Sequence, residues 1–131
     1  MSEIKVDNLT GKTSAGDITV TSEGGAATQS LQQGLAKVWA LFDQVSVALD
    51  SSLNIASTVD DAAGQWRLNF TNAMSDGSYS WGTGEQDYRV LGVNTGLVPT
   101  TTQIKFYTRV VNTSALTDVN YNNVSINGGL A

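Results

Sequence analysis

Carboxylates are the side chains of this 131-residue chain whose type and spacing could do chemistry. The candidates are Asp60, Asp61, Asp76, Glu85 and Asp87. Two carboxylates that flank a sugar-binding groove hydrolyse glycosidic bonds, one as an acid and the other as a base or nucleophile. Each candidate here lies among turn-forming residues, where Asp is favoured because it hydrogen-bonds its own backbone. Turn formation therefore explains these acidic residues better than the catalytic pair of a polysaccharide depolymerase does. We expect that the protein is not an enzyme.

The chain contains neither cysteine nor histidine. The usual zinc sites need these ligands, and a Cys nucleophile and a His general base are excluded with them. The acidic stretches also lack the loop pattern that places oxygen ligands at alternate positions around Ca²⁺. We therefore expect no metal site and no cofactor.

Charge and hydropathy limit the partners. The chain has 7 basic and 12 acidic side chains and a net charge of -5 at pH 7. Nucleic-acid binding needs a basic surface that displaces counterions from phosphates, so we expect no nucleic-acid partner. No segment approaches the roughly 20 apolar residues of a membrane span, and the polar start MSEIKV lacks the apolar core of a signal peptide. We expect a protein that is made in a cytoplasm, is not exported and does not insert into a membrane.

The elements that position these residues are mostly β-strands, and a hairpin gives the clearest signal. Apolar side chains alternate with polar ones on both sides of a turn at residues 60–64. They are Leu53, Ile55 and Val59 before the turn and Trp66, Leu68 and Phe70 after it. This period of two gives each strand one apolar and one polar face.

The same alternation predicts further strands after the hairpin, around 79–81, 88–92, 103–111 and 119–126. In the long strand 103–111, one face carries Ile104, Phe106, Thr108 and Val110, and the other carries Lys105, Tyr107 and Arg109. We expect a bulge at Asn122 and Asn123 in the last strand. Seven or eight short strands predict an all-β fold, an antiparallel β-sandwich or a jelly-roll-like domain, over residues 43–131.

Residues 1–27 are too poor in apolar side chains to fold alone. Their short alternating runs contain Ile4 and Val6, then Ile18 and Val20. Such a segment is either a frayed terminus with a short edge hairpin or an extended arm that adds a strand to a neighbouring subunit. In the second case these four residues are the candidates for arm attachment.

A short helix is expected next, over Thr28 to Lys37, within a segment 28–42 that ends in a lead-in strand. Leu31, Leu35 and Val38 fall at helical spacing on one face. This face either packs on the β domain or meets its symmetry mates around a threefold axis, as in a small coiled-coil seam. The three residues are therefore the candidates for a trimer interface.

Two stretches resemble a module that is widespread in tailed bacteriophages, especially those of marine and cyanobacterial hosts. They are SLQQGLAKVWALFD at 30–43 and SLNIASTVDDAAGQWRLNFTNAMSDGSY at 52–79. In that family a polar helix leads into AKAWVNF, followed by SFNVSSITDNGTGDYTVNFTTAMADANY. The start SEIKVDNL also resembles phage tail-fibre and appendage proteins. Here the family's NGTG is Asp61 to Gly64, its tyrosine is Trp66, and residues 43–50 are more apolar than in the family.

The resemblance implies a homotrimeric virion protein, assembled in the cytoplasm of the host bacterium. It would be a tail-fibre or appendage subunit that contributes to attachment, with other virion proteins and a host surface glycan as partners. Its candidate receptor contacts are Trp81, Glu85 and Tyr88, although aromatic residues more often fill a core. The alternative is a capsid decoration protein at threefold positions of the head, whose arm would clamp major capsid subunits.

Overall fold

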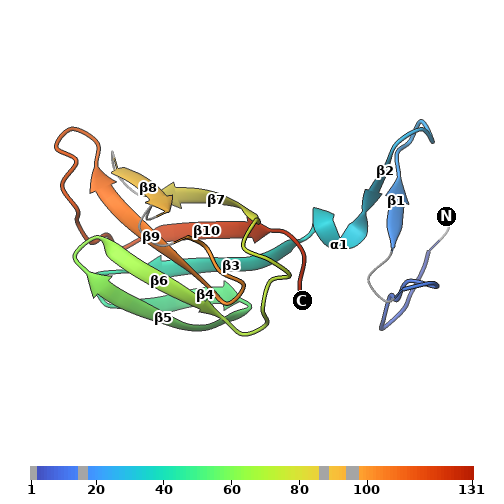
Figure 1. The fold of residues 1–131 in the computed structure, drawn as a ribbon, viewed down its shortest axis with the longest axis horizontal. Helices are drawn as coiled ribbons and strands as arrows, with labels where there is room; N and C mark the ends of the chain where they lie inside the picture. The colour runs from blue at the N-terminus through green and yellow to red at the C-terminus, as the bar shows by residue number, and fades with distance from the viewer. Residues whose placement is uncertain (1–2, 15–17, 86–88, 94–97) are drawn as a thin grey trace. The chain divides into compact units, whose positions relative to one another are not determined.

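The computed structural model describes residues 3–14, 18–85, 89–93 and 98–131. The chain forms two compact units, Met1–Leu35 and Ala36–Ala131 (Figure 1). The boundary lies inside the segment 28–42 that was expected to hold both the helix and the lead-in strand. The helix belongs to the first unit and the strand to the second.

The first unit contains a two-stranded hairpin and one helical turn. Strands β1 (Thr19–Thr21) and β2 (Thr28–Ser30) pair antiparallel, and the turn between them uses Gly25 at a φ of 72°. Helix α1 (Leu31–Gly34) follows β2 directly, and the Ser30 side chain caps it by accepting a hydrogen bond from the backbone N–H of Gln33. Residues 3–10 adopt no regular structure.

The expectation of a helix from Thr28 to Lys37 is wrong in extent, because only four residues are helical. Residues 28–30 pair with β1 instead, and the chain is extended again from Ala36. A short isolated helix is marginal in water, so strand pairing on both sides overrides the helical spacing. Gly34, a poor helix former, lies where the helix ends.

The second unit consists of two four-stranded antiparallel sheets. One has the order β4 (Ala48–Leu53), β3 (Ala36–Asp43), β10 (Asn122–Asn127) and β7 (Ser80–Glu85). The other has the order β5 (Ile55–Ala62), β6 (Gln65–Phe70), β9 (Gln103–Val110) and β8 (Arg89–Val93). The expected all-β class with a single short helix is confirmed for the described residues.

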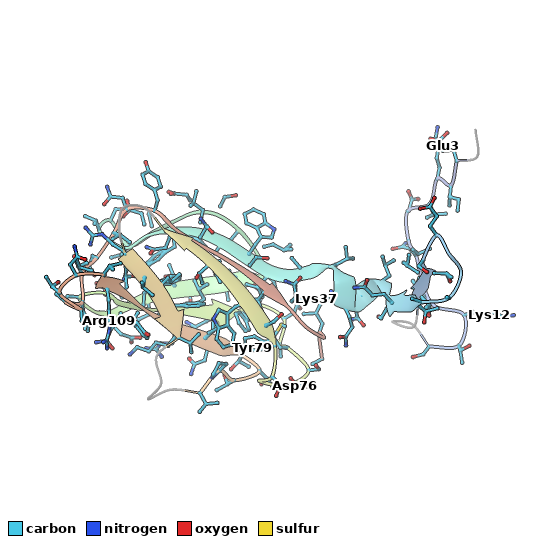
Figure 2. All side chains as sticks on the ribbon, turned by 90° about the horizontal axis from the view of Figure 1, so that it is seen from above. Glu3, Lys12, Lys37, Asp76, Tyr79 and Arg109 are labelled. Carbon is cyan, nitrogen blue, oxygen red and sulfur yellow. The ribbon has the colours of Figure 1, made fainter. Side chains whose placement is uncertain are left out.

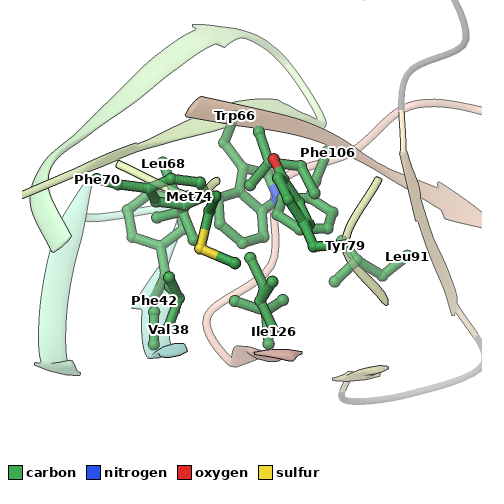
Figure 3. Packing of buried hydrophobic residues seen from close by; sticks show 13 residues of the cluster. Val38, Phe42, Trp66, Leu68, Phe70, Met74, Tyr79, Leu91, Phe106 and Ile126 are labelled. Carbon is green, nitrogen blue, oxygen red and sulfur yellow. The ribbon is translucent and has the colours of Figure 1, made fainter. Parts of the chain in front are cut away.

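Both sheets contribute side chains to one buried cluster (Figure 3). The Trp66 ring lies at its centre, with centroids 4.8 Å from those of Phe42 in one sheet and Phe106 in its own. The other members include Val38, Ala40, Leu68, Phe70, Met74, Tyr79, Leu91, Ile104, Val124 and Ile126. Every second residue of β6 is buried, and in β9 Ile104, Phe106 and Thr108 are buried while Val110 is half-buried, which confirms the faces predicted from alternation.

The hairpin predicted around residues 60–64 is formed by β5 and β6. Gly64 turns the chain at a φ of 63°, and a Cβ there would lie 2.4 Å from the backbone nitrogen of Thr117. Leu53 was assigned to the wrong strand, because it ends β4 in the other sheet. Asn54, at a φ of 61°, separates the strands, and its side-chain oxygen accepts from the backbone N–H of Asn72 at 2.7 Å.

The bulge expected at Asn122 and Asn123 is absent, because β10 pairs with β3 in unbroken register from Asn122 to Ile126. The bulge was inferred from an apolar pattern that included Tyr121, but Tyr121 is exposed and Asn122 takes the inward position. The Asn122 side chain is fully buried and hydrogen-bonded, so a polar residue continues the inward face.

Candidate functional site

The first unit exposes its apolar side chains. None of its described residues is buried. Its large apolar residues Ile4, Val6, Leu9, Val20 and Leu35 are each at least 50% exposed. Burial of such side chains is the main source of folding free energy, so the described part of this unit lacks a core and needs contacts from outside it.

A hollow of about 180 Å³ lies within the first unit, between the hairpin and α1. Its apolar lining comes from Val20 of β1 and from Leu31 and Leu35 on either side of the helical turn, with Gly34 between them. A hollow of this size takes one apolar group about as large as benzene. We call this space the N-terminal hollow, and these residues its lining.

The N-terminal hollow joins residues from two predicted sites. Val20 was a candidate for arm attachment, and Leu31 and Leu35 were candidates for a trimer interface. Val38 does not join them, because it lies in β3 and is fully buried in the core of the second unit. The three residues therefore do not form one helical seam.

The remaining arm candidates are spread along the first unit. Ile4 and Val6 are strongly exposed in the irregular segment 3–10, and neither lines the N-terminal hollow. Ile18 is half-buried, and its carbonyl oxygen accepts a hydrogen bond from the backbone N–H of Leu31 at 2.7 Å. Ile18 therefore connects the hairpin to α1.

Of the three predicted receptor contacts, Trp81 and Glu85 lie within the described residues and Tyr88 does not. Trp81 in β7 pairs in register with Ile126 and is 41% exposed. Glu85 ends β7, and Tyr88 lies outside the described residues, as does Asp87. Trp39 in β3 is a second exposed indole that was not predicted, and it pairs with Leu53 of β4. The alternation of buried Val38 and Ala40 around Trp39 would have indicated it.

The candidate acids make structural contacts. Asp61 accepts hydrogen bonds from the Arg67 guanidinium and forms a 3.1 Å ion pair with the Lys105 Nζ. Burial opposes ionisation of Asp61, but the hydrogen bonds and charges of these two cations outweigh it and lower its pKa. Asp76 accepts from the backbone N–H of Ser78 at 2.7 Å, as expected for an Asp in a turn.

Within the described ranges, no three acidic, His or Cys side chains gather where they could hold a metal ion. In that same part of the chain, no helix is long and apolar enough to cross a membrane.

A buried polar cluster at one end of the core was also missed. The Thr108 hydroxyl of β9 donates to the Gln44 side-chain oxygen at 3.0 Å, and the Asn122 side-chain amide donates to the same oxygen at 3.3 Å. All three side chains are buried, so this polar cluster joins the two sheets. The sequence offered one signal for this cluster, because Thr108 is a polar residue on the otherwise apolar face of strand 103–111.

Comparisons with protein families, with curated proteins and with solved structures found no match.

Proposed function

We propose that the chain is a structural subunit of a tailed-phage virion, a homotrimer of a tail fibre or appendage that contributes to attachment. It is assembled in the host cytoplasm with other virion proteins as partners, and it is not an enzyme. The observation that carries the proposal is the first unit, whose large apolar side chains are exposed; two of them, Val20 and Leu35, line the N-terminal hollow. A unit without a core is suited to assembly, since association buries the side chains that the chain leaves exposed.

The N-terminal hollow supports association between copies. Val20 and Leu35 are each half exposed, and a neighbouring subunit could place an apolar side chain between them. Ile4 and Val6, which are 85% and 60% exposed, are the candidates to provide it, since the arm was predicted to dock on a neighbour. Threefold symmetry would repeat this contact in a closed ring.

For the second unit we propose a β-sandwich with Greek-key connections. One core cluster shared by two four-stranded sheets supports it. The order β5-β6-β9-β8 matches the A-B-E-D sheet of immunoglobulin-type sandwiches, with β7 and β10 in the positions of C and F. Strand β3 takes the position of G although it precedes β5 in the chain, and β4 is an additional edge strand. A jelly roll would pair the second strand, β4, with the second-last strand, β9, but these strands lie in different sheets.

The experiment that tests the role is immunogold labelling of intact phage particles with an antibody to this chain. Gold on the tail or its projecting fibres is the expected result. Gold spread evenly over the head would replace this role with capsid decoration, in which the first unit clamps capsid subunits. Particles without gold would contradict both virion roles.

A further inference from the structure

The outer face of the β5-β6-β9-β8 sheet gathers basic residues. Along β9, Lys105, Tyr107 and Arg109 alternate with buried residues, so their side chains share this face. Arg67 of β6 lies directly opposite Lys105 in register. Three of the seven basic residues of an acidic chain therefore lie on one sheet face.

One acid partly balances these charges. Asp61 of β5 forms ion pairs with both Arg67 and Lys105. Like charges directly opposite each other on neighbouring strands repel, and Asp61 relieves this repulsion. Arg109 has no ion pair among the residues that the structure describes. The face defined by Arg67, Lys105, Tyr107 and Arg109, which we call the basic face, keeps a positive charge.

Arg109 lies at one end of the second unit (Figure 2), and its guanidinium stacks on a neighbouring aromatic ring. Its guanidinium carbon lies 4.7 Å from the centroid of the Tyr107 ring. The ring in turn covers Gly92 of β8, where an added Cβ would lie 2.6 Å from ring atoms. A guanidinium stacked on an aromatic ring loses little freedom on binding, and its N–H edges can still take a carboxylate or phosphate in bidentate fashion.

We propose that the basic face binds an acidic polysaccharide. Arg109 is exposed, whereas Lys105, four residues and about 14 Å away at ~3.4 Å per residue, is 14% exposed and pairs with Asp61. A polymer with repeated negative groups therefore contacts Arg109 and is attracted by the net positive charge of the Arg67–Asp61–Lys105 group. Asn69 and Gln103, paired in register beside Lys105 and Arg67, provide amides for sugar hydroxyls. The net charge of -5 repels every polyanion, and it disfavours duplex DNA most because DNA carries one negative charge per about 1.7 Å of its length.

This inference deepens the attachment role and rests on it, because it names the class of host glycan that the second unit would contact. It also places that contact away from Trp81, which lies in the other sheet. The binding itself can be measured on the purified full-length chain.

The test titrates the chain with polygalacturonate, with neutral dextran and with duplex DNA, at low and at physiological salt. We expect polygalacturonate to bind in a salt-dependent manner, dextran not to bind, and DNA to bind more weakly. Arg109→Gln should weaken polygalacturonate binding about tenfold, since it removes a charge-assisted hydrogen-bonded pair. Arg109→Lys keeps the charge but loses the bidentate guanidinium, so its affinity for polygalacturonate should lie between those of the wild type and Arg109→Gln.

Lys12→Gln is the matched control, because it removes the same charge from an exposed site of the first unit. Its binding should equal that of the wild type. Equal losses in Lys12→Gln and Arg109→Gln, no binding at low salt, or equally tight binding of DNA would each overturn the inference. A trimer without polysaccharide binding contradicts only this inference, whereas a monomer that binds contradicts only the assembly proposal.

Discussion

The substitution Thr108→Val tests whether the buried polar cluster stabilises the contact between the sheets. It replaces a hydroxyl by a methyl group of similar size, so it leaves no cavity. It removes the hydroxyl whose single hydrogen is donated to the Gln44 side-chain oxygen at 3.0 Å or, alternatively, to the Asn122 side-chain oxygen at 3.5 Å. The loss of one buried hydrogen bond, which leaves one of these two acceptors short of a donor, costs about 1.5 kcal/mol of unfolding free energy.

Urea and thermal denaturation followed by tryptophan fluorescence measure this loss, because Trp66 is fully buried in the same core. At roughly 4–8 °C per kcal/mol, the expected fall in Tm is about 6 °C or more.

Thr58→Val is the matched control. The Thr58 hydroxyl oxygen is buried and has no hydrogen-bond partner in the described structure. Replacing it by a methyl group should leave stability unchanged or raise it, because an unsatisfied polar atom is removed. If Thr108→Val is as stable as the wild type, or if the two substitutions have equal effects, the cluster does not stabilise the fold as argued.

Two further predictions concern the hairpin of β5 and β6. Gly64→Ala should lower the unfolding free energy by about 2 kcal/mol or more, because the left-handed conformation is strained and the new Cβ would meet the Thr117 backbone. Gly82→Ala, with open space around its Cβ, should change it little in the same urea titration. Asp61→Asn should cost about 1 kcal/mol at pH 7. The folded pKa of Asp61 is lowered, so its stabilisation is present above the unfolded value of about 3.9 and is lost as the pH falls through the folded pKa. The difference in stability between wild type and Asp61→Asn should therefore close in acid, and a constant difference would contradict this role.

Alternation within strands was predictable because each strand is buried on one face. Ile104, Phe106 and Thr108 were placed inward correctly, and Lys105 and Arg109 outward. The basic face was not foreseen, since it depends on the register that brings Arg67 beside Lys105. Alternation within one strand does not determine which residues of another strand lie opposite it, because strand pairing depends on residues far along the chain.

Strand ends and the short helix were less predictable. The helical spacing of Leu31, Leu35 and Val38 suggested one continuous helix, but pairing with distant β10 draws Val38 into a strand. Leu53 continued an apolar alternation across Asn54, although the chain passes there, at a φ of 61°, from one sheet to the other. In both places, contacts with residues far along the chain decided the structure.

The measurement that tests the central claim most directly is the molar mass of the purified chain by light scattering across a dilution series. We expect three times the 13.8 kDa of the chain for the wild type. Leu35→Asp should reduce this mass to that of one chain, because it places a charge in the N-terminal hollow. Leu53→Asp, at a side chain of the second unit with similar exposure, should leave the trimer intact. A wild-type mass of one chain at every concentration, or equal effects of the two substitutions, would contradict assembly through the first unit.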